Sequence, residues 1–147
     1  MAEAVHSIEI DVPVDVFFET ITDFNAYSTF LKEVQGCRLV SSDAGEHVVD
    51  YMIQVIKRME YRLRFKEDRP NRLSWSLDHP GKVIEENQGD WLLEALDDGA
   101  RTRATYTLHV KPRVFVPRAV VTRLVTITLP SLLRQFKAEA ERRHSDA

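Results

Sequence analysis

The chain ends in one long helical pattern that directly follows a run of strand patterns. Residues 117–143 place apolar side chains on a helical period, with Pro130 near the middle, whereas residues 34–110 follow a period of two. An antiparallel sheet followed by one long helix can close its core by laying the helix across the concave face. Such a core often leaves a gap between helix and sheet, so the pattern also predicts a pocket for an apolar ligand.

Short turns separate the predicted strands. Strands are predicted over residues 7–12, 37–42, 47–57, 60–66, 73–77, 82–96 and 102–110, with short helices at 17–24 and 26–31. Turns are predicted at residues 43–46, near Arg58, and at 68–71, 80–81 and 97–99, with a bulge at Gly89. Hairpins of this kind imply an antiparallel meander, and therefore an α+β fold.

The clearest alternation in the chain lies in residues 60–66. We expect the apolar positions to face the core and the charged positions to face water, because buried charges would lose their hydration without partners. The inward set is Tyr61, Leu63 and Phe65, and the outward set is Arg62, Arg64 and Lys66.

Composition excludes several classes of protein. With 147 residues and 44% hydrophobic residues, we expect a single folded domain over residues 1–147. The net charge of −3 argues against nucleic acid as a partner. Cys37 is the only cysteine, which favours a reducing compartment. We see no signal peptide and no apolar run long enough to span a membrane, so we expect a cytoplasmic protein without integral membrane association.

No motif for catalysis or for a metal is present. The five histidines do not follow a metal-binding spacing, and no phosphate-binding or nucleophile motif occurs, so we predict no metal site, no cofactor and no catalytic residue. The carboxylates nearest to the predicted interior, Glu94 and Asp50, fall on outward positions of their strands. An interior general acid or base is therefore missing from the predicted pattern.

Aromatic side chains fall mostly on inward positions of the sheet. Phe65 and Trp75 fit an ordinary core. For Tyr51, Tyr61 and Tyr106 a cavity wall is an equal alternative, because buried phenol groups need partners for their hydroxyls.

The predicted C-terminal helix offers a second wall. Thr122 and Thr126 lie one helical turn apart, and they either bond back to the helix or face the cavity. Pro130 leaves the carbonyl of Thr126 without its helical partner, which predicts a kink over the sheet.

Several segments together resemble the START-like, or SRPBCC, superfamily. These are residues 12–17 (VPVDVF) with Ile21, Asp23, Tyr27 and Phe30, then residues 89–93 (GDWLL), and the proline-bounded residues 112–117. The superfamily includes polyketide cyclase/dehydrase-like and coenzyme Q-binding proteins. The resemblance implies a helix-grip fold, a seven-stranded antiparallel sheet wrapped around a long C-terminal helix, with a cavity for lipids, quinones or polyketides.

Three functions remain open at this stage. The leading hypothesis is a carrier or binding protein for a small hydrophobic ligand; the alternatives are a polyketide aromatase/cyclase or dehydratase and a ribosome-association-type interaction module. Trp91 would serve the interaction module as an exposed anchor if the bulge at Gly89 shifted the strand. The sequence does not predict the oligomeric state. The expected ligand-binding residues are Tyr51, Tyr61, Leu63, Trp75, Trp91, Tyr106, Val121, Thr122, Val125, Thr126 and Leu129.

Overall fold

Seven strands form one antiparallel sheet in the computed structural model, which describes residues 2–54, 58–80 and 84–146. The strands are β1 (Ala2–Ile10), β2 (Val34–Asp43), β3 (Glu46–Gln54), β4 (Arg58–Asp68), β5 (Arg72–Leu77), β6 (Ile84–Leu96) and β7 (Arg101–Pro112). Their order across the sheet is β1-β7-β6-β5-β4-β3-β2. The meander predicted from the hairpin turns is therefore confirmed, with β1 added beside β7.

The α-helices of the described chain occur in two places. Between β1 and β2 lie α1 (Val14–Thr22), a 3-10 turn (Phe24–Ala26) and α2 (Tyr27–Phe30). After β7 the chain is helical from α3 (Arg118–Arg123) through a π-helical segment (Leu124–Thr128) to α4 (Leu129–Ser145). A further 3-10 turn (Asp97–Gly99) joins β6 to β7.

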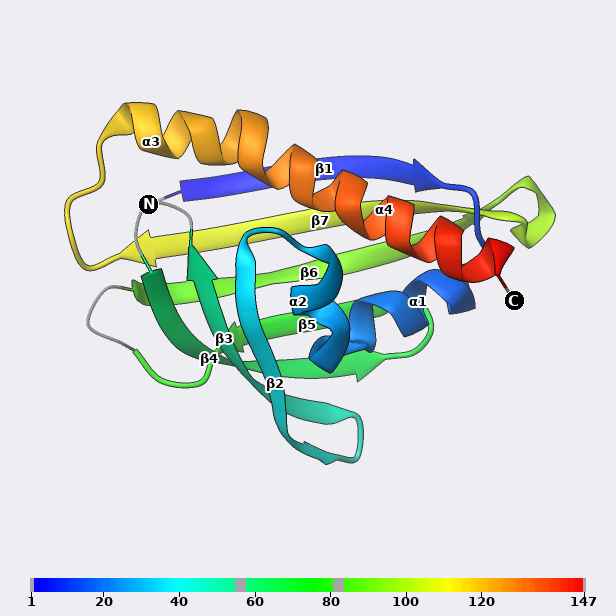
Figure 1. Ribbon diagram of the computed structural model, residues 1–147, viewed down its shortest axis with the longest axis horizontal. Helices are drawn as coiled ribbons and strands as arrows, with labels where there is room; N and C mark the ends of the chain where they lie inside the picture. Colours follow the sequence, from blue (N-terminus) through cyan, green and yellow to red (C-terminus); the bar gives the residue numbers. More distant parts are fainter. Residues whose placement is uncertain (1, 55–57, 81–83, 147) are drawn as a thin grey trace.

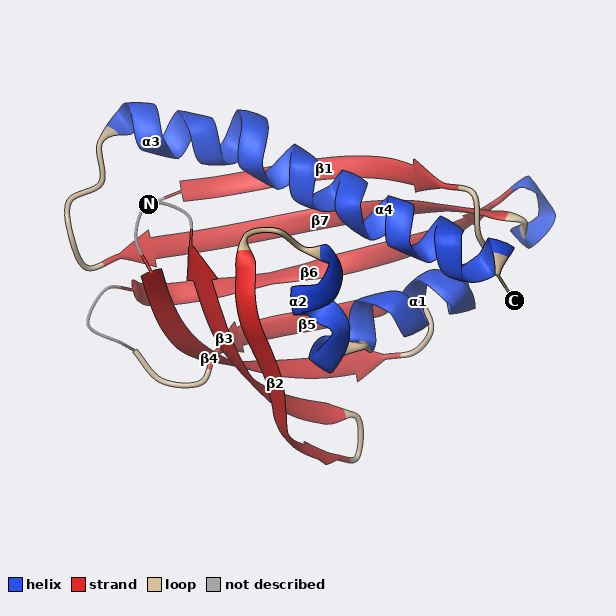
Figure 2. Cartoon of the chain, in the orientation of Figure 1, coloured by secondary structure: helices blue, strands red, loops and turns tan. Residues whose placement is uncertain are grey.

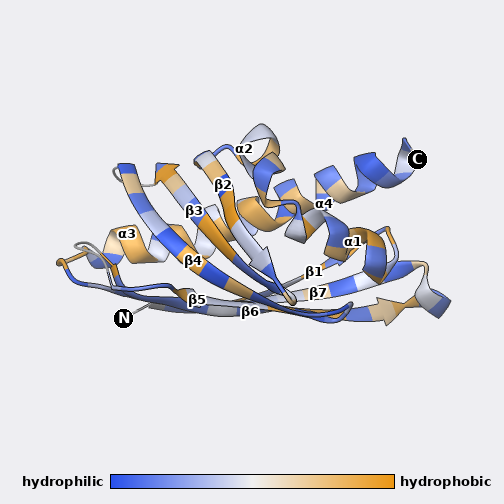
Figure 3. Ribbon diagram, turned by 90° about the horizontal axis from the view of Figure 1, so that it is seen from below, coloured by the Kyte–Doolittle hydropathy of each residue, from blue (hydrophilic) through white to orange (hydrophobic). Residues whose placement is uncertain are grey.

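The sheet curves around the C-terminal helix. Figures 1 and 2 show α3 and α4 crossing the same face of the sheet as α1 and α2. In Figure 3, β2, β3 and β4 rise from the flatter part of the sheet and wrap toward the helix. This arrangement confirms the helix-grip fold predicted for the chain.

The two ends of the helix differ in how they pack. Leu129, Leu133, Phe136 and Ala140 of α4 are buried against α1 and the sheet. By contrast, α3 and the π-helical segment contain no buried residue. The close-packed core therefore lies under α4, and the N-terminal half of the helix extends over a part of the sheet that it does not fill.

The predicted strand phase is confirmed in β4. Leu63 and Phe65 are buried and Tyr61 is partly buried, whereas Arg64 and Lys66 are exposed. Arg62 lies on the outer face, where its guanidinium Nε donates to Asp50 Oδ1 at 2.6 Å. Asp50 and the exposed Glu94 therefore both point away from the interior, as predicted.

Gly89 does not form the predicted bulge. It pairs regularly with Leu108 and Trp75, and the register of β6 shifts instead between Ile84 and Glu86. The glycine is required by close approach, since a Cβ built there would lie 2.0 Å from the carbonyl oxygen of Thr107. Because the phase is not shifted, Trp91 is 2% exposed and is not a surface anchor.

One predicted turn is absent, and another lies partly outside the described residues. Arg58 belongs to β4 rather than to a turn. Residues 55–57, which end the predicted third strand, lie outside the described residues, as do Gly81 of the predicted turn at 80–81 and the first residues of the strand predicted over 82–96.

Candidate ligand cavity

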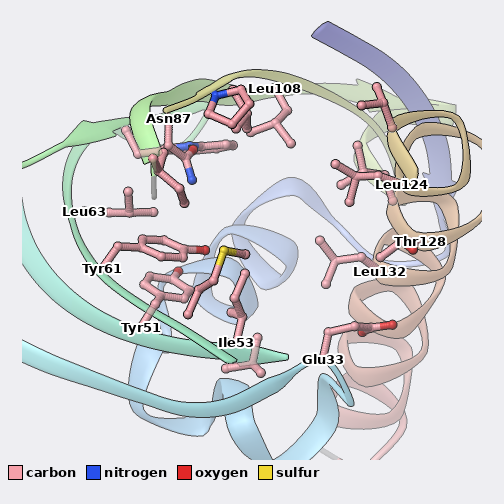
Figure 4. A pocket seen from close by; sticks show the side chains of 18 of the residues that line it. Glu33, Tyr51, Ile53, Tyr61, Leu63, Asn87, Leu108, Leu124, Thr128 and Leu132 are labelled. Atoms are coloured by element: carbon pink, nitrogen blue, oxygen red, sulfur yellow. The ribbon is translucent and has the colours of Figure 1, made fainter. Parts of the chain in front are cut away.

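A cavity of about 910 Å³ lies between the sheet and the N-terminal half of the C-terminal helix. Its walls come from β3, β4, β5, β6 and β7 on one side and from α3, the π-helical segment and α4 on the other. Figure 4 shows Tyr51, Tyr61 and Leu63 on the sheet side facing Leu124, Thr128 and Leu132 on the helix side. A volume of this size is within the range of pockets that enclose small organic ligands.

All four tyrosines and both tryptophans of the chain line this cavity. They are Tyr27, Tyr51, Tyr61, Tyr106, Trp75 and Trp91. The rings of Tyr51 and Tyr61 stack in parallel planes with centroids 5.5 Å apart. Tyr27 comes from α2. Alternation within β3, β4, β5, β6 and β7 brings the other five to one face of the sheet, and the antiparallel pairing sets them beside one another.

Phe136 of α4 separates the cavity from the packed core. Its ring lies 5.2 Å from Tyr27 and 5.3 Å from Trp91, in edge-to-face contacts between centroids. Trp91 in turn contacts Phe17 of α1 at 5.4 Å. These aromatic contacts close the inner end of the cavity with apolar surface.

Several polar groups on the wall form no hydrogen bond with a described residue. They include the hydroxyls of Tyr61 and Tyr106 and the amide nitrogen of Asn87. Asn87 uses its side-chain oxygen to accept a bond of 3.1 Å from Trp75 Nε1, and Figure 4 shows its nitrogen directed into the cavity. In the described part of the chain no fully buried side-chain polar atom lacks a partner, so the two hydroxyls and the amide nitrogen are accessible from the cavity. A ligand with a hydrogen-bond acceptor could therefore satisfy them.

Burial keeps the tyrosine hydroxyls protonated. It raises the pKa of Tyr27, Tyr51, Tyr61 and Tyr106 above the usual range of tyrosine, because a phenolate would lose its hydration in this apolar site. Tyr27 is further fixed by donating a hydrogen bond to the carbonyl oxygen of Ile21. The tyrosines therefore act as neutral hydrogen-bonding groups and not as bases.

Two charged residues also line the cavity. Lys111 forms an ion pair of 3.4 Å with Glu85, and both side chains are partly exposed. Glu33, in the loop before β2, accepts a long hydrogen bond of 3.4 Å from Gln135 of α4. Sequence reasoning missed Glu33 because it precedes the strand, where no alternation indicates the direction of a side chain.

Eight of the eleven residues expected from the sequence lie on the cavity wall. They are Tyr51, Tyr61, Leu63, Trp75, Trp91, Tyr106, Val121 and Leu129. The other three, Thr122, Val125 and Thr126, do not line it.

Helical phase explains this difference. Thr122 and Thr126 are exposed, and the hydroxyl of Thr126 donates to the carbonyl oxygen of Thr122 at 2.7 Å. Val125 lies over β1 and β7, where its carbonyl oxygen is 2.8 Å from the Nε2 atom of His6. The inward threonine is Thr128, which the sequence analysis did not select.

Asn87 was also missed. It occupies an inward position of β6, in a strand whose neighbouring residues are mostly polar, so hydropathy gives no sign of burial there. The only available signal was its even spacing from Gly89 and Trp91, which places it on the same face of the strand.

The described residues include no group of three or more histidine, cysteine, aspartate or glutamate side chains that could hold a metal ion. In the same described part, every helix is too short or too polar to cross a bilayer.

A sequence comparison assigns the chain to a family. The profile of the polyketide cyclase/dehydrase and lipid transport family matches residues 1–141, and the chain belongs to this family. No protein with a curated description matches the sequence.

Solved structures show the same fold at low sequence identity. An aromatase/cyclase from a Streptomyces species is 18% identical, with 96% of this chain and 94% of that chain covered at a TM-score of 0.83. A START superfamily protein from Mycobacterium smegmatis is 16% identical, with coverages of 97% and 99% and a TM-score of 0.83. A STAR-related lipid transfer protein from Xanthomonas axonopodis is 17% identical, with coverages of 92% and 84% and a TM-score of 0.75.

Proposed function

We propose that the protein binds a small hydrophobic or amphipathic ligand, such as a lipid, a quinone or a polyketide-like compound, and acts as its carrier or binding protein. The supporting observation is the cavity of about 910 Å³ under a helical segment, residues 118–128, that has no buried residue of its own. A ligand that covers this apolar surface removes it from water, and this burial stabilises the complex. The family includes lipid transport in its description, which agrees with this proposal.

The polar groups of the wall would orient the ligand. Tyr61, Tyr106 and Asn87 offer donors to an acceptor oxygen, such as a ketone, quinone or ester carbonyl. These groups are neutral, so they favour a neutral polar end over a carboxylate.

The two tryptophans provide the test, because both line the cavity and the chain has no others. A naphthoquinone probe should quench their fluorescence and saturate at one molecule per chain. The variant Val121→Phe fills the cavity from the helix side and should weaken binding at least about fivefold, since overpacking of this size commonly costs about 1 kcal/mol or more. The matched control is Thr122→Phe, which adds a ring on the exposed face of the same turn and should leave binding unchanged.

If the naphthoquinone quenches Val121→Phe and Thr122→Phe equally, the proposal is contradicted. As an independent test, native mass spectrometry of the protein purified from its own host should detect a retained ligand. A variant Asn87→Leu should bind the quinone less tightly, while an apolar probe without a carbonyl should bind as before.

The second candidate is a polyketide aromatase/cyclase or dehydratase. Glu33 favours it, because a carboxylate on the cavity wall supplies the general acid or base that this chemistry requires. Glu33→Gln should then abolish turnover of a poly-β-ketone substrate and leave its binding intact. If wild type and Glu33→Gln leave the bound substrate equally unchanged, the carrier proposal is favoured.

A further inference from the structure

The loop between β7 and α3 exposes apolar side chains at the rim of the cavity. Phe115 is 89% exposed and Val114 is 44% exposed, yet both belong to the lining of the cavity. Figure 1 shows this loop at one end of the molecule, away from the packed core and from the C-terminus. An aromatic side chain held in water at a rim loses the stabilisation that burial would give it.

The outer face of the helix that follows extends this surface. One face of residues 118–128 is exposed, and it carries Arg118, Ala119, Thr122, Arg123, Thr126 and Ile127. Ile127 is 53% exposed. The opposite face, with Val120, Val121, Leu124 and Thr128, lines the cavity. The segment is therefore apolar on its inner face and mixed basic and apolar on its outer face.

The stretch of chain that forms this surface carries basic side chains and no acidic ones, although Glu85 of β6 pairs with Lys111 nearby. From Gly99 to Ala138 the chain has no aspartate or glutamate, although the whole molecule has a net charge of −3. The basic residues of this stretch are Arg101, Arg103, Lys111, Arg113, Arg118, Arg123, Arg134 and Lys137. Arg101, Arg103, Lys111 and Lys137 pair with acids from other segments, whereas Arg118 and Arg123 form no ion pair with any described residue.

We propose that residues 113–127 form a docking surface for an anionic lipid bilayer. Val114 and Phe115 enter the interfacial region of the bilayer, and Arg118 and Arg123 contact the anionic headgroups, which is how peripheral apolar and basic segments bind membranes. Docking in this orientation sets the rim of the cavity against the membrane, so a hydrophobic ligand passes between the two without crossing water. A bilayer fits better than a protein partner because a single protruding ring can insert without a matching pocket, and because Arg118 and Arg123 form no ion pair with a described residue.

Vesicle co-sedimentation of the full chain tests this surface. The wild type should bind phosphatidylcholine vesicles that contain phosphatidylglycerol, bind pure phosphatidylcholine much less, and be released by salt. Phe115→Ala should weaken the binding about tenfold, because the variant loses the free energy gained by burying a phenyl ring. Arg118→Gln and Arg123→Gln should each weaken it about fivefold, since one basic residue near an anionic surface contributes about this much.

Matched controls come from surfaces remote from the loop. Leu92→Ala removes an exposed apolar side chain from the outer face of the sheet, and Arg142→Gln removes an exposed charge near the C-terminus. Both should bind vesicles as the wild type does. The cavity-filling variant Val121→Phe should also bind vesicles normally, which separates docking from ligand binding.

A second measurement places the residue in the bilayer. In Phe115→Trp, lipids brominated on their acyl chains should quench the added fluorescence, and the wild-type signal from Trp75 and Trp91 should change little. Absence of vesicle binding, or binding that Phe115→Ala leaves unchanged, would overturn the proposal. Phe115-dependent binding to an acidic protein without vesicle binding would overturn it in favour of a protein partner.

Discussion

At the scale of single residues, close packing rather than turn geometry requires a glycine at position 89 of β6. A Cβ at Gly89 would lie 2.0 Å from the carbonyl oxygen of Thr107 and 2.7 Å from Trp75 Cζ2. The absence of a side chain leaves room for the indole of Trp75, whose Nε1 donates a hydrogen bond to Asn87. One glycine thus shapes the polar part of the cavity wall.

The first prediction is that Gly89→Ala destabilises the protein by about 1–3 kcal/mol or more, because the strand or the indole must shift. Denaturant unfolding would measure this change. Gly36→Ala is the control, since a Cβ there meets only Met52 Cβ at 3.7 Å, and its effect should stay within about 0.5 kcal/mol. Equal stabilities of the two variants would show that β6 has room at Gly89.

The partly buried thiol of Cys37 should react slowly. Burial raises the pKa of its thiol to about 12, so the fraction of reactive thiolate at neutral pH is very small. We expect a thiol reagent to label the folded protein at least about a hundredfold more slowly than a free cysteine. Labelling in denaturant is the control, and it should proceed at the rate of free cysteine. Rapid labelling of the native protein would contradict this prediction.

At the scale of elements, the C-terminal helix is two segments joined by a π-helical turn. The amide of Leu129 donates to the carbonyl oxygen of Leu124, five residues before it. Pro130 follows as the second residue of α4, where the lack of an amide hydrogen is tolerated. Figure 1 shows the helix bending between α3 and α4, so the proline and the π-helical turn together set how α3 covers the cavity.

Pro130→Ala should therefore straighten the helix and raise the melting temperature. The gain should be well below the roughly 3 kcal/mol of a proline in an unadapted helix, because the π-helical turn already accommodates it. Uptake of the quinone probe, followed by stopped-flow quenching of Trp75 and Trp91, should become slower. A variant that melts at a lower temperature and takes up the probe at an unchanged rate would exclude a role for the proline at the entrance.

At the scale of the whole molecule, the fold is packed at one end and hollow at the other. The rings of α1, α4 and the sheet fill the first end, and all four tyrosines surround the hollow. Tyrosine ionisation therefore reports on the integrity of the entire cavity.

This property predicts the behaviour of the protein in alkali. The folded state keeps its tyrosine protons above about pH 10, where the unfolded chain releases them, so the unfolded state binds fewer protons. The free energy of unfolding must then fall as the pH rises above this value. Tyrosinate absorbance should appear together with the loss of far-ultraviolet circular dichroism. Tyrosinate that forms near pH 10 in a protein with a native spectrum would contradict the burial of the tyrosines in the cavity.

The sequence by itself determined the elements and the inner faces of the strands. Alternation in residues 60–66 and a helical period near the C-terminus are local patterns, and they predicted the sheet, the helix and eight wall residues. Tertiary structure decided the rest. Thr128 and not Thr122 faces the cavity because the phase of the helix depends on how α4 packs against α1, far away in the chain. Three features depend on how distant elements are spaced: the volume of the cavity, the open donors at Asn87 and the exposure of Phe115. A local sequence pattern cannot predict unfilled space between elements that are far apart in the chain.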